Sequence, residues 1–153
     1  MCKDEIIKEL ESLRNNDFEA DRIKIANDVL EWIKQQGKSM DSEKLLEEWK
    51  QRLGLSDWRI VLSDKCTPQE MELENVDGCT SWEESIKSAT IQILDEKYYG
   101  DRIIPFDFEK TLVHELLHLK TSFISNTGND LQDRIAHQLI DDLARAFVDA
   151  KRH

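Results

Sequence analysis

The feature that most constrains the fold is a change in hydrophobic period at Gly54. Before this glycine, apolar residues recur every three or four positions, which is the spacing of one face of an α-helix. After it they alternate with polar residues over short runs, as in half-buried β-strands. Helical spacing returns after about residue 107. We therefore predict an α+β fold: N-terminal helices, a short mixed sheet of about three strands, and two C-terminal helices.

The region before Gly54 is predicted to be helical. Apolar stripes fall within residues 6–13 and 25–33, and the polar, glycine-containing stretch 36–38 is predicted to end the second helix. A third helix is expected to start at Asp41 and stop at Gly54. Two interpretations of residues 1–53 stay open. They form either a helical layer packed on the 54–153 core, within one compact domain, or a prosegment or partner-binding arm.

Three short segments after Gly54 have the character of strands. Residues 58–62 alternate and are rich in β-formers, residues 79–82 are a shorter candidate, and residues 89–94 are the clearest. Residues 63–78 are polar and contain a proline and a glycine, so we expect them to be mostly loop.

Two helices are predicted to close the chain. Asp107 is a suitable N-cap for a helix running to about Ile124, and residues 125–129 have the composition of a turn. A long helix from about residue 130 to 150 follows. The apolar stripe on the first of these helices, which we expect to be buried, consists of Leu112, Leu116, Leu119 and Phe123.

The same helix carries a His-Glu-x-x-His motif at His114, Glu115 and His118. Residues four apart on a helix lie about 6 Å from each other on one face, so two imidazoles can bind one zinc ion. Glu115 then projects to one side, where it can act as a general base on a water molecule without being a ligand. The two histidines lie opposite the apolar stripe, which predicts that they face a cleft.

A third ligand is expected on the last helix. A polar turn follows His118, and two antiparallel helices joined by it would bring His137 back beside the motif. Asp141 lies one turn further on the same face, where it could accept the second N–H of a metal-bound imidazole. Asp133 lies one turn the other way and is the rival ligand. We predict a zinc site formed by His114, His118 and His137, supported by Asp141.

Composition restricts the partners. The net charge is −11, from 32 acidic and 21 basic residues, so the surface should repel nucleic acid and anionic lipid. No apolar run approaches the ~18 residues that span a bilayer, and the charged N-terminus does not resemble a signal peptide. The three cysteines, Cys2, Cys66 and Cys79, are widely spaced, which favours reduced thiols and a cytoplasmic location.

With these motifs in place, residues 55–150 resemble the small zincin peptidases, particularly minimal gluzincin-like proteins of prokaryotes and phages. The matching stretches are residues 55–60, 88–93, 108–118 and 137–144. The resemblance implies a short sheet covering the active-site helix, with an edge strand that binds extended substrate. Carried over, that edge strand would contain Thr90, Ile91, Gln92 and Ile93. The family usually has glutamate as third ligand, followed by a supporting aspartate; here His137 and Asp141 stand in those places.

The implied activity is zinc-dependent hydrolysis of peptide bonds, with Glu115 taking a proton from water and passing it to the leaving amine. Tyr98, Tyr99, Arg134 and His153 are candidates for stabilising the oxyanion. Two other functions remain open. One is a zinc-stabilised binding or accessory module of phage or mobile-element type that performs no catalysis. The other is a regulatory peptidase that cleaves a specific protein partner.

Overall fold

The computed structural model describes residues 20–124 and 127–153, with the backbone alone at 20–26 and 32–40. The chain divides into two compact units, Met1–Ser42 and Glu43–His153. Helix α2 (Ala20–Arg52) crosses this division, so its last turns belong to the second unit, which also contains the sheet and the candidate site. The helix expected within residues 6–13 and the first cysteine, Cys2, lie outside the described residues.

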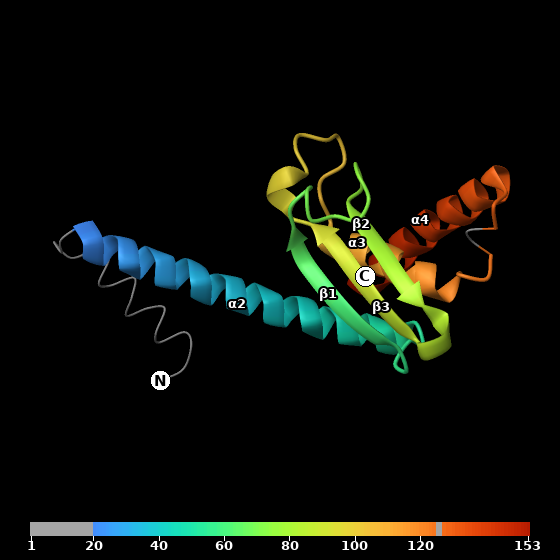
Figure 1. Ribbon diagram of the computed structural model, residues 1–153, viewed down its shortest axis with the longest axis horizontal. Coiled ribbons are helices and arrows are strands. Elements are labelled where there is room, and N and C mark those ends of the chain that lie inside the picture. Colours follow the sequence, from blue (N-terminus) through green and yellow to red (C-terminus); the bar gives the residue numbers. More distant parts are fainter. Residues whose placement is uncertain (1–19, 125–126) are drawn as a thin grey trace. The chain divides into compact units, whose positions relative to one another are not determined.

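The second unit is built on a three-stranded mixed sheet, as predicted. Strand β1 (Arg59–Cys66) runs parallel to β3 (Ser88–Leu94), and β2 (Gly78–Glu83) runs antiparallel to β3. The strand order is β1-β3-β2, which Figure 1 shows face on. β1 is longer than expected, because it continues through the first residues of the stretch predicted to be loop. Together with the helices, the sheet confirms the α+β class.

β3 is the central strand, and this corrects the position expected for it. Thr90, Ile91, Gln92 and Ile93 each pair with β1, β2 or both, so the backbone of β3 is already used in the sheet. The edges are β1 and β2. An extended peptide cannot add to a strand that has neighbours on both sides, so these four residues do not form a substrate-binding edge.

The core lies between one face of the sheet and two helices, α3 (Phe108–Lys120) and α4 (Asp130–Arg152). On β3, alternate residues point into this core: Ala89, Ile91 and Ile93 are all buried. Leu112 and Leu116 of α3 are fully buried against them, and the end of α2 adds Leu46 and Trp49. A smaller apolar cluster contains Cys66, Met71, Cys79 and Leu94, and both its cysteines are free thiols.

Two predicted helix ends are wrong. α2 continues through residues 36–38, because one glycine within a helix costs only about 1 kcal/mol and does not force a break. It ends where expected, with Gly54 in the left-handed region at φ +66°. α3 ends at Lys120, where the Thr121 hydroxyl bonds the Leu117 carbonyl. Phe123 is therefore outside the helix and 78% exposed, not part of the buried stripe. No helix in the described part of the chain is long and apolar enough to cross a bilayer.

Half-buried and exposed charged side chains join the ends of three helices. Asp107 caps α3 by accepting from the Lys110 N–H, as predicted, and also pairs with Arg152 of α4 at 2.7 Å. Glu109 accepts from Trp49 Nε1 at 2.7 Å and from Lys151 Nζ at 2.5 Å. Burial by itself would raise the pKa of Glu109, but these hydrogen bonds outweigh it and lower the pKa. The Arg152 guanidinium likewise lowers the pKa of Asp107.

We expect Glu109→Gln to lower the free energy of unfolding by about 1–2 kcal/mol, because charge-assisted hydrogen bonds to a largely buried carboxylate are lost. A matched control is Glu48→Gln, which removes a more exposed carboxylate paired with the same Lys151 and should cost under about 1 kcal/mol. Urea unfolding at neutral pH measures both. If the two variants lost the same free energy of unfolding, the stabilising role of Glu109 would be contradicted.

The same carboxylate predicts a pH dependence. A carboxyl group whose pKa is lower in the folded than in the unfolded state stabilises the fold at pH values above its unfolded pKa. This stabilisation is lost as the pH falls through the pKa of the folded state. The wild-type protein should therefore lose stability below about pH 4.5, and Glu109→Gln should lose less over that range.

Candidate metal centre

Helix α3 presents the motif as predicted. Its N-cap is Asp107, and its apolar residues Leu112 and Leu116 face the core with no exposed surface. Burial of Leu112 and Leu116 fixes the rotation of the helix about its axis. The face that carries His114 and His118 is therefore directed away from the centre of the core. His114 Nε2 lies 3.1 Å from His118 Nε2, which means that the two rings direct nitrogens at one point.

α4 brings the third histidine to that point. The centroid of the His137 ring lies 4.8 Å from that of His114 and 5.5 Å from that of His118. One nitrogen of each ring lies within 4.8 Å of the others, as in groups that hold a metal ion. Ligand nitrogens about 2.0–2.1 Å from a tetrahedral zinc are a little over 3 Å apart, so the 3.1 Å separation fits a shared ion. The donor set therefore suits zinc, and the structure assembles the three predicted histidines.

The carboxylate of Asp141 lies beside two of the three histidines. Its Oδ1 lies 2.8 Å from Nδ1 of His114, and its Oδ2 lies 3.6 Å from Nδ1 of His137. A carboxylate that accepts a hydrogen bond from the Nδ1–H of His114 favours the tautomer with a lone pair on Nε2. Nε2 is the nitrogen that faces His118. Asp133, the rival ligand, lies outside the histidine group and instead accepts from the backbone N–H and hydroxyl of Thr127.

Glu115 leaves α3 toward the sheet and is only 4% exposed. The Thr80 hydroxyl of β2 donates to its Oε2 at 2.7 Å. Thr80 pairs with Ile91 and Gly78 with Ile93, so both β2 residues lie on the face of the sheet that covers α3. A Cβ at Gly78 would lie 2.7 Å from Glu115 Oε1 and 3.0 Å from Thr111 Cγ2. Gly78 therefore provides the space that the carboxylate occupies.

The protonation states suit this arrangement. Burial, with nearby His114 and His137, lowers the pKa of His118 to about 4, and burial also lowers the pKa of His114. Both rings are therefore neutral at pH 7, the form that binds metals. Burial raises the pKa of Glu115 to about 7, while the bond from Thr80 acts in the opposite direction. A carboxylate with a pKa near 7 can both take and return a proton at neutral pH.

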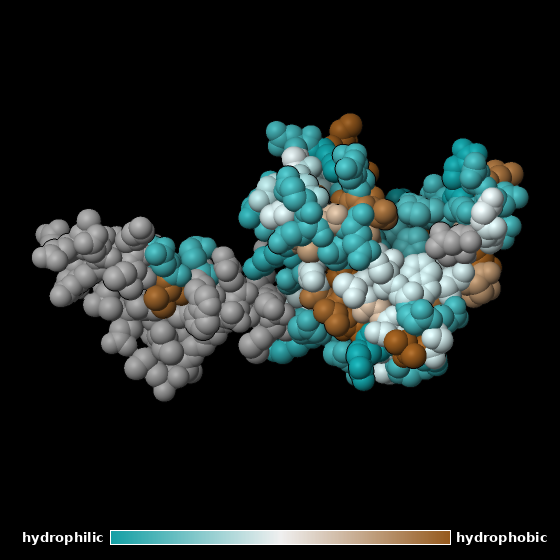
Figure 2. All heavy atoms as spheres, viewed as in Figure 1, coloured by the Kyte–Doolittle hydropathy of each residue, from teal (hydrophilic) through white to brown (hydrophobic). Residues whose placement is uncertain are grey.

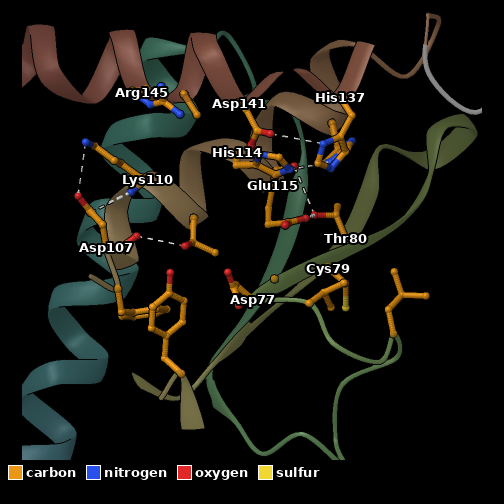
Figure 3. A pocket seen from close by; sticks show the side chains of 18 of the residues that line it. Asp77, Cys79, Thr80, Asp107, Lys110, His114, Glu115, His137, Asp141 and Arg145 are labelled. Atoms are coloured by element: carbon orange, nitrogen blue, oxygen red, sulfur yellow. Dashed lines mark hydrogen bonds and ion pairs between the residues drawn. The ribbon is translucent and has the colours of Figure 1, made fainter. Parts of the chain in front are cut away.

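These residues line one cavity of about 710 Å³. Figure 3 shows His114, His137 and Asp141 along one wall, with Glu115 and Thr80 beside them. β2 forms another wall, through Gly78, Cys79, Thr80 and Trp82. The loop before α3 closes a third side with Tyr99, Ile104 and Phe106. Ile104 and its neighbour Ile103 are well exposed, and Figure 2 shows hydrophobic side chains standing out over this loop at the top of the view.

Some of the residues predicted to form the site line this cavity, and others do not. His114, Glu115, His118, His137 and Asp141 all line it, whereas none of the four β3 residues expected to bind substrate does. Of the candidates for stabilising an oxyanion, only Tyr99 belongs to the lining. Sequence reasoning missed Thr80 and Gly78. No local signal marks them, because their role depends on which β2 residues lie opposite Glu115.

The space at Gly78 can be tested without any activity assay. Gly78→Ala should lower the free energy of unfolding by about 1–3 kcal/mol, because the new methyl group overlaps Glu115 and Thr111. In a Glu115→Ala background the carboxylate is gone, so the same substitution should cost clearly less. Thermal or urea unfolding of the wild type, the two single variants and the double variant gives the coupling free energy between positions 78 and 115. Equal costs in both backgrounds would show that Gly78 does not accommodate Glu115.

Comparison with known proteins adds no relative: no family model, curated protein or solved structure matches this chain. The interpretation of the site therefore depends on its residues and their geometry alone.

Proposed function

We propose that this protein is a zinc-dependent peptidase that uses Glu115 as its general base. The observation that carries the proposal is the convergence of three imidazoles within 4.8 Å beside a buried carboxylate, in a cavity of about 710 Å³. A site that only stabilises a fold closes the coordination of zinc with four protein ligands. Three histidines leave a position for water or substrate, and a non-ligand glutamate beside them has a use only in catalysis.

A zinc ion held by three imidazoles would polarise both a water molecule and the carbonyl of the peptide bond to be cleaved. Glu115 is the group that removes a proton from the attacking water and returns it to the leaving amine. Thr80 holds the carboxylate in place through Oε2, and Gly78 leaves room for it. Asp141 orients His114 through Nδ1, so that its other nitrogen stays directed toward His118.

We place the extended substrate along β2. This strand is an edge of the sheet and lines the cavity through Gly78, Cys79, Thr80 and Trp82, whereas β3 does neither. A peptide can add its backbone to a free edge and so present one carbonyl to the histidine group. The buried free thiols of Cys66 and Cys79 fit a reducing compartment, which supports the cytoplasm as the location of the protein.

The proposed ligands predict that substitutions at three positions of α4 weaken zinc binding to different degrees. The purified protein should contain about one zinc per chain, and His137→Ala should weaken zinc binding by more than about 100-fold. Asp141→Asn should weaken it about 10–100-fold, because support for the ligand is lost but the ligand is kept. Asp133→Asn is the matched control on the same helix and should have little effect. Elemental analysis and competition with a chelator measure these values.

Two results would contradict the metal site. One is a protein that holds no transition metal even after reconstitution with zinc. The other is a His137→Ala protein that binds zinc like the wild type.

The catalytic step is tested by Glu115→Gln. The amide cannot accept a proton, so hydrolysis of a broad peptide library should fall at least about 100-fold while zinc content stays the same. Glu48→Gln makes the same chemical change outside the cavity and should retain activity. If Glu115→Gln cleaved peptides as fast as the wild type, Glu115 would not be the base. If the zinc-loaded wild type cleaved nothing, the non-catalytic binding module would replace this proposal.

A further inference from the structure

Each acidic or basic side chain that lines the cavity makes an ion pair or a hydrogen bond with another described residue, with one exception. Asp77 pairs with Arg102 at 2.8 Å and Asp107 with Arg152 at 2.7 Å. Lys110 pairs with Asp149 at 3.0 Å. The remaining acids are engaged as well, Asp141 by the histidines and Glu115 by Thr80.

The exception is Arg145 of α4. It lines the cavity, is exposed, and among the described residues makes no ion pair or hydrogen bond. This is unexpected in a chain of net charge −11, because acidic residues stand at the helical spacings that favour pairing with it. Each of those residues has another partner: Asp141 contacts His114, Asp142 accepts from Gln138, and Asp149 pairs with Lys110. The Arg145 guanidinium is thus left available to a ligand.

The position of Arg145 relates it to the metal centre. His114 of α3 contacts Asp141 of α4, and Lys110 contacts Asp149, so the two helices run antiparallel along the cavity. Arg145 lies between these two contacts, one helical turn of about 6 Å beyond Asp141. In Figure 3, Arg145 and Lys110 lie at the end of the cavity away from His137.

We propose that Arg145 determines specificity by binding a carboxylate of the substrate close to the peptide bond that is cleaved. This inference rests on the proposed peptidase function and adds the substrate class, peptides with an acidic group on one side of that bond. A guanidinium binds a carboxylate through two parallel N–H bonds, and its charge acts more strongly in a partly enclosed cavity than in water. The carboxylate is either the C-terminus of the peptide or an aspartate or glutamate side chain.

The experiment measures binding separately from turnover, using the full-length, zinc-loaded Glu115→Gln protein. One arm compares short neutral peptides with a free C-terminus and the same peptides with a C-terminal amide. The other uses peptides blocked at both ends, with glutamate or glutamine at each position in turn. In one arm we expect the carboxylate form to bind at least about tenfold more tightly. The arm that shows the preference identifies the source of the carboxylate.

Adding Arg145→Gln should abolish the preference, and Arg145→Glu should reverse it. Arg59→Gln removes an exposed arginine of β1 outside the cavity and should leave it intact. No preference in either arm, no peptide binding, or a preference that survives Arg145→Gln would overturn the inference. Hydrolysis by the protein with Glu115 intact is measured in parallel. A binding preference without any hydrolysis would overturn the peptidase proposal and leave recognition by Arg145 standing.

Discussion

The burial of α3 between the sheet and α4 is the constraint on which the candidate site depends. Leu112 and Leu116 have no exposed surface, so the helix can neither rotate nor shift without opening the core. Because side chains leave a helix at fixed angles, this packing directs His114 and His118 to the cavity and Glu115 to β2. α4 packs on the same helix and adds His137 to the group.

Two glutamates on α3 show how the surroundings of one residue type decide its role. Glu109 is held by Trp49, Lys151 and Arg152, and its pKa is lowered, so it stays charged and joins the helix ends. Glu115 is more deeply buried and receives one side-chain hydrogen bond, from Thr80, and burial raises its pKa to about 7. The first is an anchor for the fold, and the second is suited to carry a proton.

Local patterns were sufficient for most of the candidate metal centre. The spacing of His114 and His118 needs only a helix, and Asp107 and the apolar residues Leu112 and Leu116 predicted the start and the buried face of that helix correctly. His137 and Asp141 followed from two helices joined by a short turn. The errors arose where local signals were weak: the glycine within α2 did not end the helix, and Thr121 ended α3 before Phe123. Such ends depend on small differences between competing hydrogen bonds.

The sequence by itself therefore determined the α+β class, the three strands and the residues able to bind a metal, because helical and strand periods place side chains on faces without reference to the rest of the chain. Only the tertiary structure decided the strand order, which makes β2 and not β3 the edge beside the cavity. It also decided that Thr80 and Gly78 meet Glu115, and that Arg145 makes no ion pair or hydrogen bond with the residues that the structure describes. These contacts join residues far apart in the chain, and their register is set by packing of the whole core.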